Sequence, residues 1–192
     1  MNRITKAALG GIAGCALVLG GTQAAIGDSI RQFFSGKVFD LDSAGARAGT
    51  TGAFDSAKAL LKVTETSEGS TTLWLRVKGI DVDFAGKTFG SHLHTGVCDP
   101  TAEDPYNAVG PHFKLPLDPE NQSQAPLRER EVWFDLIPNE DGVAVDKSLV
   151  PVVPWDLDDG VMSIVIHAQA TDEGTGLAGS KEVCLPVDVT TT

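Results

Sequence analysis

Two histidines stand two residues apart in the stretch SHLHTGVC at 91–98, and a cysteine follows four residues after the second. A β-strand places residues i and i+2 on the same face, so the imidazoles of His92 and His94 can point at one metal ion. An isolated His-x-His pair is a weak signal, because a single histidine is more often an ordinary polar residue than a ligand. The pair becomes informative only if the fold brings further ligands to it.

The chain contains two other histidines. His112 stands in VGPHF at 109–113, and His167 ends the alternating segment SIVIH at 163–167. With His92 and His94 they make four imidazoles, a number that suits the tetragonal geometry of Cu(II). Imidazole also suits zinc, so the ligand type alone does not choose the metal.

The segments around these histidines have the pattern of short strands joined by turns. Leu73, Leu75 and Val77 alternate with other residues, and the same period of two recurs in 131–137 and 161–167. About eight such segments and no convincing helix predict an all-β antiparallel sandwich or barrel with long loops.

Length and composition fit one globular domain behind an export signal. The chain has 192 residues, of which 42% are hydrophobic, and a formal net charge of −11. This acidity argues against nucleic acid or an anionic membrane surface as partner, because phosphate groups attract a basic face. We expect a signal peptide at 1–24, an N-terminal extension with a strand at 25–56, and the β domain at 57–192.

The signal peptide is predicted from a positive start and an uncharged apolar run. Arg3 and Lys6 precede this run, which is too short for a membrane span, and small residues up to Ala24 offer a cleavage site. Cleavage there leaves an extracytoplasmic chain without an integral membrane span. The alternative is lipidation, because the segment IAGC ending in Cys15 resembles a bacterial lipobox. The intact mass of the mature protein distinguishes the two.

Two cysteines, Cys98 and Cys184, remain after cleavage. An even count in an oxidising compartment indicates a disulfide, and export disfavours the alternative of two free thiols. Such a bridge would close a loop of more than 80 residues. On the chain-entropy model it contributes roughly 4–5 kcal/mol to stability.

The order of these motifs resembles that of the copper/zinc superoxide dismutases. In that family a His-x-His motif is followed closely by a cysteine, then by Gly-x-His-Phe, Asp-Leu, a strand-end Val-x-His, and a glycine-rich segment with a basic residue three before a second cysteine. The matching residues here are His92-Leu93-His94 with Cys98, Gly110-Pro111-His112-Phe113, Asp135-Leu136, Val165-Ile166-His167, and Gly179-Ser180-Lys181-Glu182-Val183-Cys184. The resemblance covers about residues 57–187 and includes all four histidines and both mature cysteines.

The resemblance implies a fold, a ligand set and a disulfide. The fold would be an eight-stranded antiparallel Greek-key β-barrel, and Cys98–Cys184 would be its disulfide. The four copper ligands would be His92, His94, His112 and His167. The activity would be that of a superoxide dismutase, which converts superoxide to dioxygen and hydrogen peroxide.

The resemblance also implies roles in catalysis. His112 would be the ligand that releases copper on reduction and donates a proton. Lys181 stands where the family usually has an arginine that attracts superoxide, and lysine keeps the charge but loses the planar fork of donors. Ligating histidines usually donate their other N–H to an acceptor, and we expect Asp135 to accept from His112.

The chain departs from the family at the zinc site. The family adds two histidines and an aspartate to the bridging copper ligand, but no histidine lies between His112 and Asp135, and Val132 stands where one is expected. A structural zinc site normally needs four protein ligands. Glu129 or Glu131 could add one, although nothing in the spacing requires it. We therefore expect copper and no zinc.

Two other functions stay open at this point. One is an exported copper-binding protein on the same fold without turnover, because a fold does not fix a function. The other is a zinc-bound hydrolytic or structural domain that uses the same imidazoles. Metal content and dismutase activity measured on one preparation separate the three possibilities.

Overall fold

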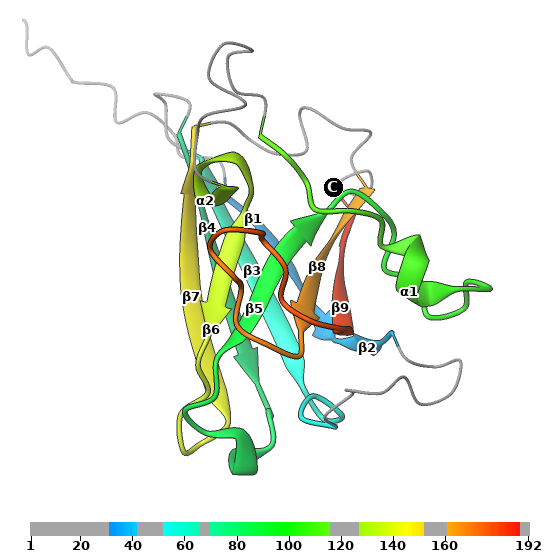
Figure 1. Cartoon of the computed structure of the whole chain (residues 1–192), viewed down its shortest axis with the longest axis vertical. Coiled ribbons are helices and arrows are strands. Elements are labelled where there is room, and N and C mark those ends of the chain that lie inside the picture. The colour runs from blue at the N-terminus through cyan, green and yellow to red at the C-terminus, as the bar shows by residue number, and fades with distance from the viewer. Residues whose placement is uncertain (1–30, 42–51, 66–69, 116–126, 152–160, 189–192) are drawn as a thin grey trace, which may run out of the picture.

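The computed structural model describes residues 31–41, 52–65, 70–115, 127–151 and 161–188 (Figure 1). The expected signal peptide, with Cys15 and the cleavage site, lies outside these residues.

One sheet contains four strands in the order β1-β3-β4-β7, all antiparallel. Their bounds are β1 (Arg31–Lys37), β3 (Lys58–Glu65), β4 (Thr71–Lys78) and β7 (Val143–Val150). Side chains alternate along each strand. In β4 the predicted alternation is confirmed, because Leu73, Leu75 and Val77 are fully buried.

The second sheet contains five strands in the order β2-β9-β8-β5-β6, again antiparallel. Their bounds are β2 (Phe39–Asp40), β5 (Phe89–His94), β6 (Trp133–Leu136), β8 (Val161–His167) and β9 (Lys181–Asp188). The two sheets enclose the main hydrophobic core, to which β5 contributes Phe89 and Leu93 and β8 contributes Ile164 and Ile166. The predicted all-β antiparallel class is confirmed, as a sandwich whose sheets do not close into a barrel.

The first predicted strand is two strands in the structure. β1 pairs with β3 in one sheet, and β2 pairs with β9 in the other, so the chain crosses between the sheets at the buried Val38. Nine strands are therefore described where about eight were expected. Both new strands lie in 25–56, so the described part of that segment belongs to the sandwich.

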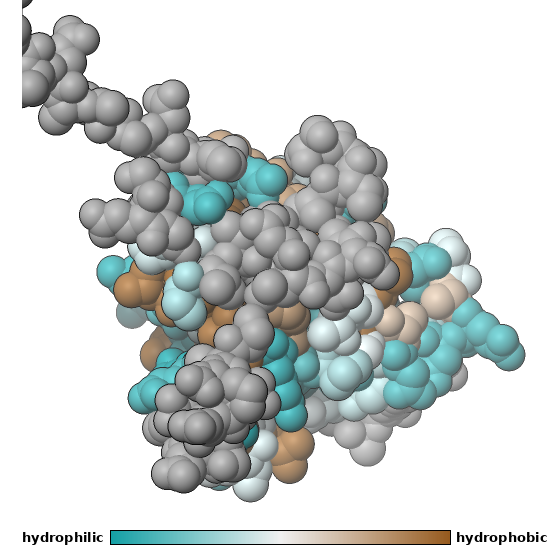
Figure 2. Space-filling view, turned by 90° about the horizontal axis from the view of Figure 1, so that it is seen from above, coloured by the Kyte–Doolittle hydropathy of each residue, from teal (hydrophilic) through white to brown (hydrophobic). Residues whose placement is uncertain are grey.

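Among the described residues, three short helical segments interrupt the connections, namely the 3-10 turn Val82–Phe84, α1 (Pro105–Ala108) and α2 (Leu127–Arg130). The carboxylate of Asp104 accepts from the Asn107 backbone N–H and so caps the start of α1. Within the described ranges, no helix has the length and apolar character needed to cross a membrane. Figure 2, seen from above, shows hydrophilic and hydrophobic residues interspersed on the surface.

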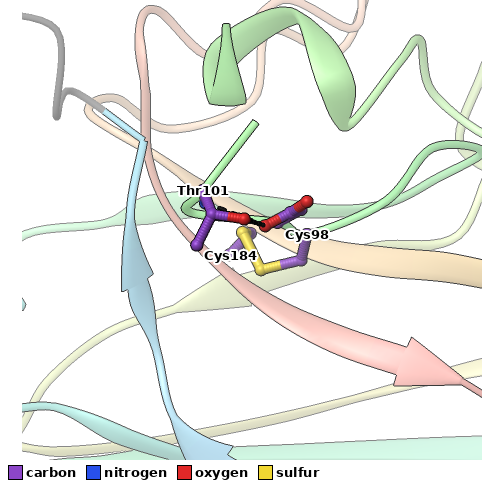
Figure 3. Close-up of a disulfide and its surroundings, with 4 residues drawn as sticks. Cys98, Thr101 and Cys184 are labelled. Atoms are coloured by element: carbon purple, nitrogen blue, oxygen red, sulfur yellow. Dashed lines mark hydrogen bonds between the residues drawn. A yellow bond between two sulfur atoms is a disulfide. The ribbon is translucent and has the colours of Figure 1, made fainter. Parts of the chain in front are cut away.

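The disulfide between Cys98 and Cys184 is present and joins the loop after β5 to strand β9 (Figure 3). The cysteines are 86 residues apart in sequence, and their Cα atoms are 5.7 Å apart. Both are buried in a small cluster with Leu41, Val109 and Val165 on the outer side of the five-stranded sheet. The bridge therefore fastens the loop that follows His94 to strand β9.

Candidate metal centre

Strand β5 carries two of the four histidines on its outer face. Phe89 and Leu93 point into the core, and by alternation His92 and His94 point away from it. Both imidazoles are nevertheless fully buried, because loops cover this face of the sheet. β5 lies between β8 and β6, so its backbone is fixed on both sides.

His112 reaches the site through backbone pairing beside the end of β5. The Phe113 N–H donates to the Leu93 carbonyl at 2.8 Å, and the Thr95 N–H donates to the Pro111 carbonyl at 3.1 Å. His94 and His112 face each other across this bridge. This pairing therefore fixes the backbone on both sides of His112 beside the end of β5.

His167 is placed by the end of β8 and by a bulge in its partner β9. Ile166 pairs with Val183, but His167 pairs with Lys181, so Glu182 is an extra residue on β9. A bulge of this kind bends a strand and redirects a side chain. Here it sets Lys181 directly opposite His167.

The four histidines converge on one point. One ring nitrogen from each lies within 4.8 Å of the others. Nδ1 of His92 is 3.3 Å from Nε2 of His167, which is 3.4 Å from Nε2 of His94. Two ring nitrogens that share a tetrahedral metal at about 2.0 Å would be roughly 3.3 Å apart. The predicted ligands are thus brought together with spacings that suit a metal ion.

The outward nitrogens of two histidines have fixed protonation. Nδ1 of His94 lies 2.9 Å from the Gly110 carbonyl oxygen, and Nδ1 of His112 lies 2.8 Å from Oε2 of Glu131. A carbonyl or a carboxylate only accepts, so both outward nitrogens carry the proton. Burial keeps the His94 ring neutral, so its inward Nε2 presents a lone pair to the centre, which is the state that binds a metal.

The other two histidines also have outward partners. Nε2 of His92 is 2.9 Å from the Thr171 hydroxyl, and Nδ1 of His167 is 3.4 Å from the Gly179 carbonyl oxygen. All four rings are therefore oriented by a group on their far side. The outward protons of His94 and His167 leave two inward lone pairs that meet at 3.4 Å and repel each other unless a cation lies between them. The donor set fits a resident metal.

Glu131 is the carboxylate that orients His112. It is 5% exposed, and the same Oε2 also accepts from Nε1 of Trp133 at 2.8 Å. Burial by itself raises the pKa of this carboxyl, but the hydrogen bonds from His112 and Trp133 outweigh it and lower the pKa. Glu131 is thus an anion at neutral pH with two donors on one oxygen.

The expectation that Asp135 accepts from His112 is wrong. Asp135 forms an ion pair with Arg128, which also reaches Glu173 at 3.3 Å. Pairing of Lys114 with Glu131 brings Glu131 beside His112, whereas Asp135 lies four residues further on, roughly 13 Å along an extended chain.

The loop between β8 and β9, residues 168–180, packs directly on the outer face of β5 and crosses in front of it in Figure 1. The Gly90 N–H donates to the Gln169 carbonyl at 2.7 Å. A β-carbon at Gly90 would collide with the Thr171 side chain. The absence of a side chain at this position therefore lets Thr171 reach His92.

Lys181 lies beside the histidines and is held in place. Nζ donates to the carbonyls of Tyr106 at 3.0 Å and Gly110 at 3.2 Å, and it lies 4.9 Å from the centre of the Tyr106 ring. The Gly110 carbonyl is also the acceptor of the His94 proton. The ammonium group of Lys181 and the ring of His94 thus donate to the same backbone oxygen.

Burial keeps the buried imidazoles neutral. It is the largest of the causes that lower the pKa of His94 to about 3 and that of His167 to about 4, and nearby His112 and Lys181 act in the same direction. The pKa of His92 is lowered even more, first by burial and then by the other histidines. The Gly110 and Gly179 carbonyls act in the opposite direction, because they accept from ring N–H groups.

Sequence reasoning missed several residues that build this site. Thr171 and Trp133 belong to no motif, and the sequence suggests Glu131 only as a zinc ligand. When the hydrogen-bond partner of a histidine is distant from it in sequence, no regular spacing between the two residues reveals the pair. The general rule that a ligating histidine donates its second nitrogen predicts that a partner exists without saying which residue it is.

Comparison with known proteins gives a fold and no closer relative. No protein-family model and no curated protein matches the chain. The structure of the clock protein EA4 has a TM-score of 0.50 at 13% identity, over 86% of this chain and 97% of that one. The Cu/Zn superoxide dismutase from Brucella abortus has a TM-score of 0.50 at 13% identity, over 84% and 100%. A variant of superoxide dismutase 5 from Candida albicans has a TM-score of 0.43 at 14% identity, over 82% and 92%.

The two TM-scores of 0.50 support a shared fold. The chain has the β-sandwich of the Brucella abortus Cu/Zn superoxide dismutase, together with a four-histidine cluster that could hold a metal. The expected family resemblance is thereby supported at the level of the fold.

The depressed pKa values predict that the metal-free protein loses stability in mild acid. Below about pH 6.5 the unfolded chain protonates its histidines, whereas folded His167 and His94 stay neutral down to about 4 and about 3. Stability is therefore complete above about pH 6.5 and falls as the pH decreases toward those values. Urea unfolding of metal-free protein between about pH 7 and about pH 5 should show a loss of a few kcal/mol.

The matched variant is His94→Gln, which removes one of the groups that the unfolded state protonates. Its stability should change less steeply over the same pH range. A wild-type stability that stays constant across this window contradicts the prediction.

Proposed function

We propose that this protein is an exported, copper-dependent superoxide dismutase. The observation that carries the proposal is the convergence of one ring nitrogen from each of four histidines. The second nitrogen of each ring points outward and lies beside a backbone carbonyl, a carboxylate or a hydroxyl. The shared fold with a Cu/Zn superoxide dismutase supports the same reaction. His92, His94, His112 and His167 would hold the copper.

Copper bound here would supply the one-electron chemistry that oxidises one superoxide to dioxygen and reduces a second, with two protons, to hydrogen peroxide. The chain positions the ligands and controls access. His112 is the least buried ligand, with 18% of its side chain exposed, whereas the other three are closed off. Among the four rings, that of His112 is therefore the one best placed to exchange a proton with solvent, while Glu131 holds the proton on Nδ1.

The proposal specifies copper without a neighbouring zinc. In the family that the sequence resembles, zinc binds the far nitrogen of the bridging histidine. Here the corresponding nitrogen of His112 is bonded to Glu131. Within the described residues, the four histidines are the one group of three or more histidine, cysteine or acidic residues that converges as a metal site. Imidazole suits copper and zinc alike, so the choice of copper is supported by the number of histidines and by the shared fold with a Cu/Zn superoxide dismutase.

Lys181 is proposed to attract the substrate anion. The net charge of −11 repels superoxide at long range, so attraction must come from a cation close to the copper. Lys181 sits opposite His167, and its charge contributes to lowering the pKa of both His94 and His167. Salt screens the charges of surface groups that are more than about 8–10 Å away, but it weakens the attraction between superoxide and nearby Lys181 much less.

Export fits the presence of a buried disulfide, since such bonds persist in oxidising compartments. We propose an extracytoplasmic location, which means that the protein is secreted, periplasmic or part of the cell envelope. If Cys15 is lipidated, the protein is anchored to the membrane by that lipid.

Metal content and activity on one preparation test the proposal. Mature protein from copper-replete cells should contain one copper per chain, show the electron paramagnetic resonance of Cu(II), and consume superoxide. A His94→Gln protein should lose most of the copper and the activity. Full copper occupancy without turnover would favour the alternative of a non-catalytic copper-binding protein, and stoichiometric zinc beside copper would contradict the copper-only site.

Removal of the Lys181 charge should slow capture of superoxide. A Lys181→Gln protein with full copper occupancy is expected to lose about tenfold in kcat/KM at low ionic strength, and less at high salt. Lys58→Gln is the matched control, because Lys58 belongs to the other sheet and bears the same charge. Equal losses in the two variants would show that Lys181 has no special role.

Glu131 and Asp135 give a paired test of which carboxylate supports the site. Glu131→Gln weakens the acceptor of the His112 proton and should reduce copper affinity about 10–100-fold. Asp135→Asn changes the same charge on a residue bonded to Arg128 and should leave the affinity unchanged. Competition with a chelator measures both, and a reversed order would refute the assignment of Glu131.

A further inference from the structure

The outer face of the four-stranded sheet gathers much of the positive charge of this acidic protein. We call this surface the basic face, and its cations are Lys37, Lys58, Lys62, Arg76, Lys78 and Lys147. Strand register places them on one side, because directly paired residues of antiparallel strands share a face and alternate residues return to it.

The cations lie in neighbouring rows across the sheet. Lys37 pairs with Lys58, which pairs with Lys78, so three lysines form one row. In another row Lys62 and Lys147 flank Trp74. Like charges directly opposite each other destabilise a sheet, so this arrangement is unfavourable for folding alone.

No carboxylate on the sheet offsets these charges. The residues that share the face in the four register rows are basic, apolar, serine or threonine, and none is aspartate or glutamate. Within the part of the chain that the structure describes, the basic-face cations form no ion pair with an acidic side chain.

Apolar side chains project from the same face. Phe33 is 58% exposed, Val145 47% and Leu149 74%, and Trp74 is half-buried between its lysine neighbours. A surface that binds a soluble polyanion would need only the cations. Cations mixed with exposed aromatic and aliphatic side chains are the composition that binds the interface of a lipid bilayer.

A shallow hollow lies within the basic face. Its volume is about 340 Å³, and the side chains around it include Lys58, Leu60, Arg76 and Lys78. Three cations around one small depression suit a phosphodiester group, whose oxygens accept several charge-assisted hydrogen bonds.

We propose that the basic face docks this protein on the surface of an anionic phospholipid bilayer. The hollow takes a lipid phosphate, and Phe33 and Leu149 enter the interfacial layer. The metal centre lies on the outer side of the opposite sheet, so a docked molecule presents its histidines away from the bilayer. The proposal is independent of which metal the histidines hold.

The negative net charge is compatible with this docking. Packed sheets are about 10 Å apart, and the Debye length at physiological ionic strength is about 8 Å. Acidic groups on the far side of the sandwich are therefore largely screened from a bilayer that touches the basic face. Each lysine or arginine close to an anionic leaflet raises partitioning by roughly fivefold.

Vesicle flotation tests the proposal with the mature protein. Vesicles of phosphatidylcholine with about one third phosphatidylglycerol should carry the protein upward at physiological salt, and vesicles of phosphatidylcholine alone should not. The Lys58→Glu/Lys78→Glu variant should bind at least about tenfold more weakly. The Lys87→Glu/Lys114→Glu variant changes net charge equally outside the basic face and should bind like the wild type.

A second variant separates the bilayer from other anions. Phe33→Ser/Leu149→Ser keeps every charge and should reduce vesicle binding several-fold, while circular dichroism and the unfolding midpoint verify that each variant is folded. Failure to bind anionic vesicles overturns the proposal. So do equal losses in the two charge variants, or binding to soluble polyphosphate that leaves the apolar variant unaffected. The proposal is also overturned if analytical ultracentrifugation shows that the wild-type protein self-associates and the Lys58→Glu/Lys78→Glu variant does not, because the basic face would then be an interface between copies.

Discussion

The site depends on the hydrogen bonds that hold the outward nitrogens of the histidines. Carbonyls at Gly110 and Gly179, the Thr171 hydroxyl and the Glu131 carboxylate occupy the far side of the four rings. Because the Gly110 and Gly179 carbonyls hold the outward protons of His94 and His167 and burial keeps both rings neutral, their Nε2 atoms turn lone pairs toward a common centre. That arrangement is repulsive without a cation and is a ready ligand set with one.

The rest of the five-stranded sheet serves to keep those acceptors in position. The missing side chain at Gly90 lets the loop of 168–180 settle on β5. The bulge at Glu182 brings Lys181 opposite His167, and the disulfide fixes the chain that leads from β5 toward His112. Each device acts on the outer face of the sheet, whereas the core behind it is ordinary apolar packing.

The two outer faces of the sandwich have opposite characters. One is covered by loops and holds the buried imidazoles, and the other carries the cations and the exposed apolar side chains of the basic face. The net charge does not reveal this difference between the two faces, because it is a sum over all charged residues of the chain. An acidic composition is therefore a sound argument about average solubility and a poor one about a particular surface.

The sequence by itself determined the β architecture, the pairing of Cys98 with Cys184 through a family resemblance, and the four candidate ligands, because alternation and motif order are local properties of the chain. Only the tertiary structure decided that Glu131 rather than Asp135 supports His112, and that Thr171 supports His92. It also decided that lysines scattered along three strands share one row. Those relations depend on strand register and on loops packed across a sheet, and residues distant in sequence become neighbours only once the register is set.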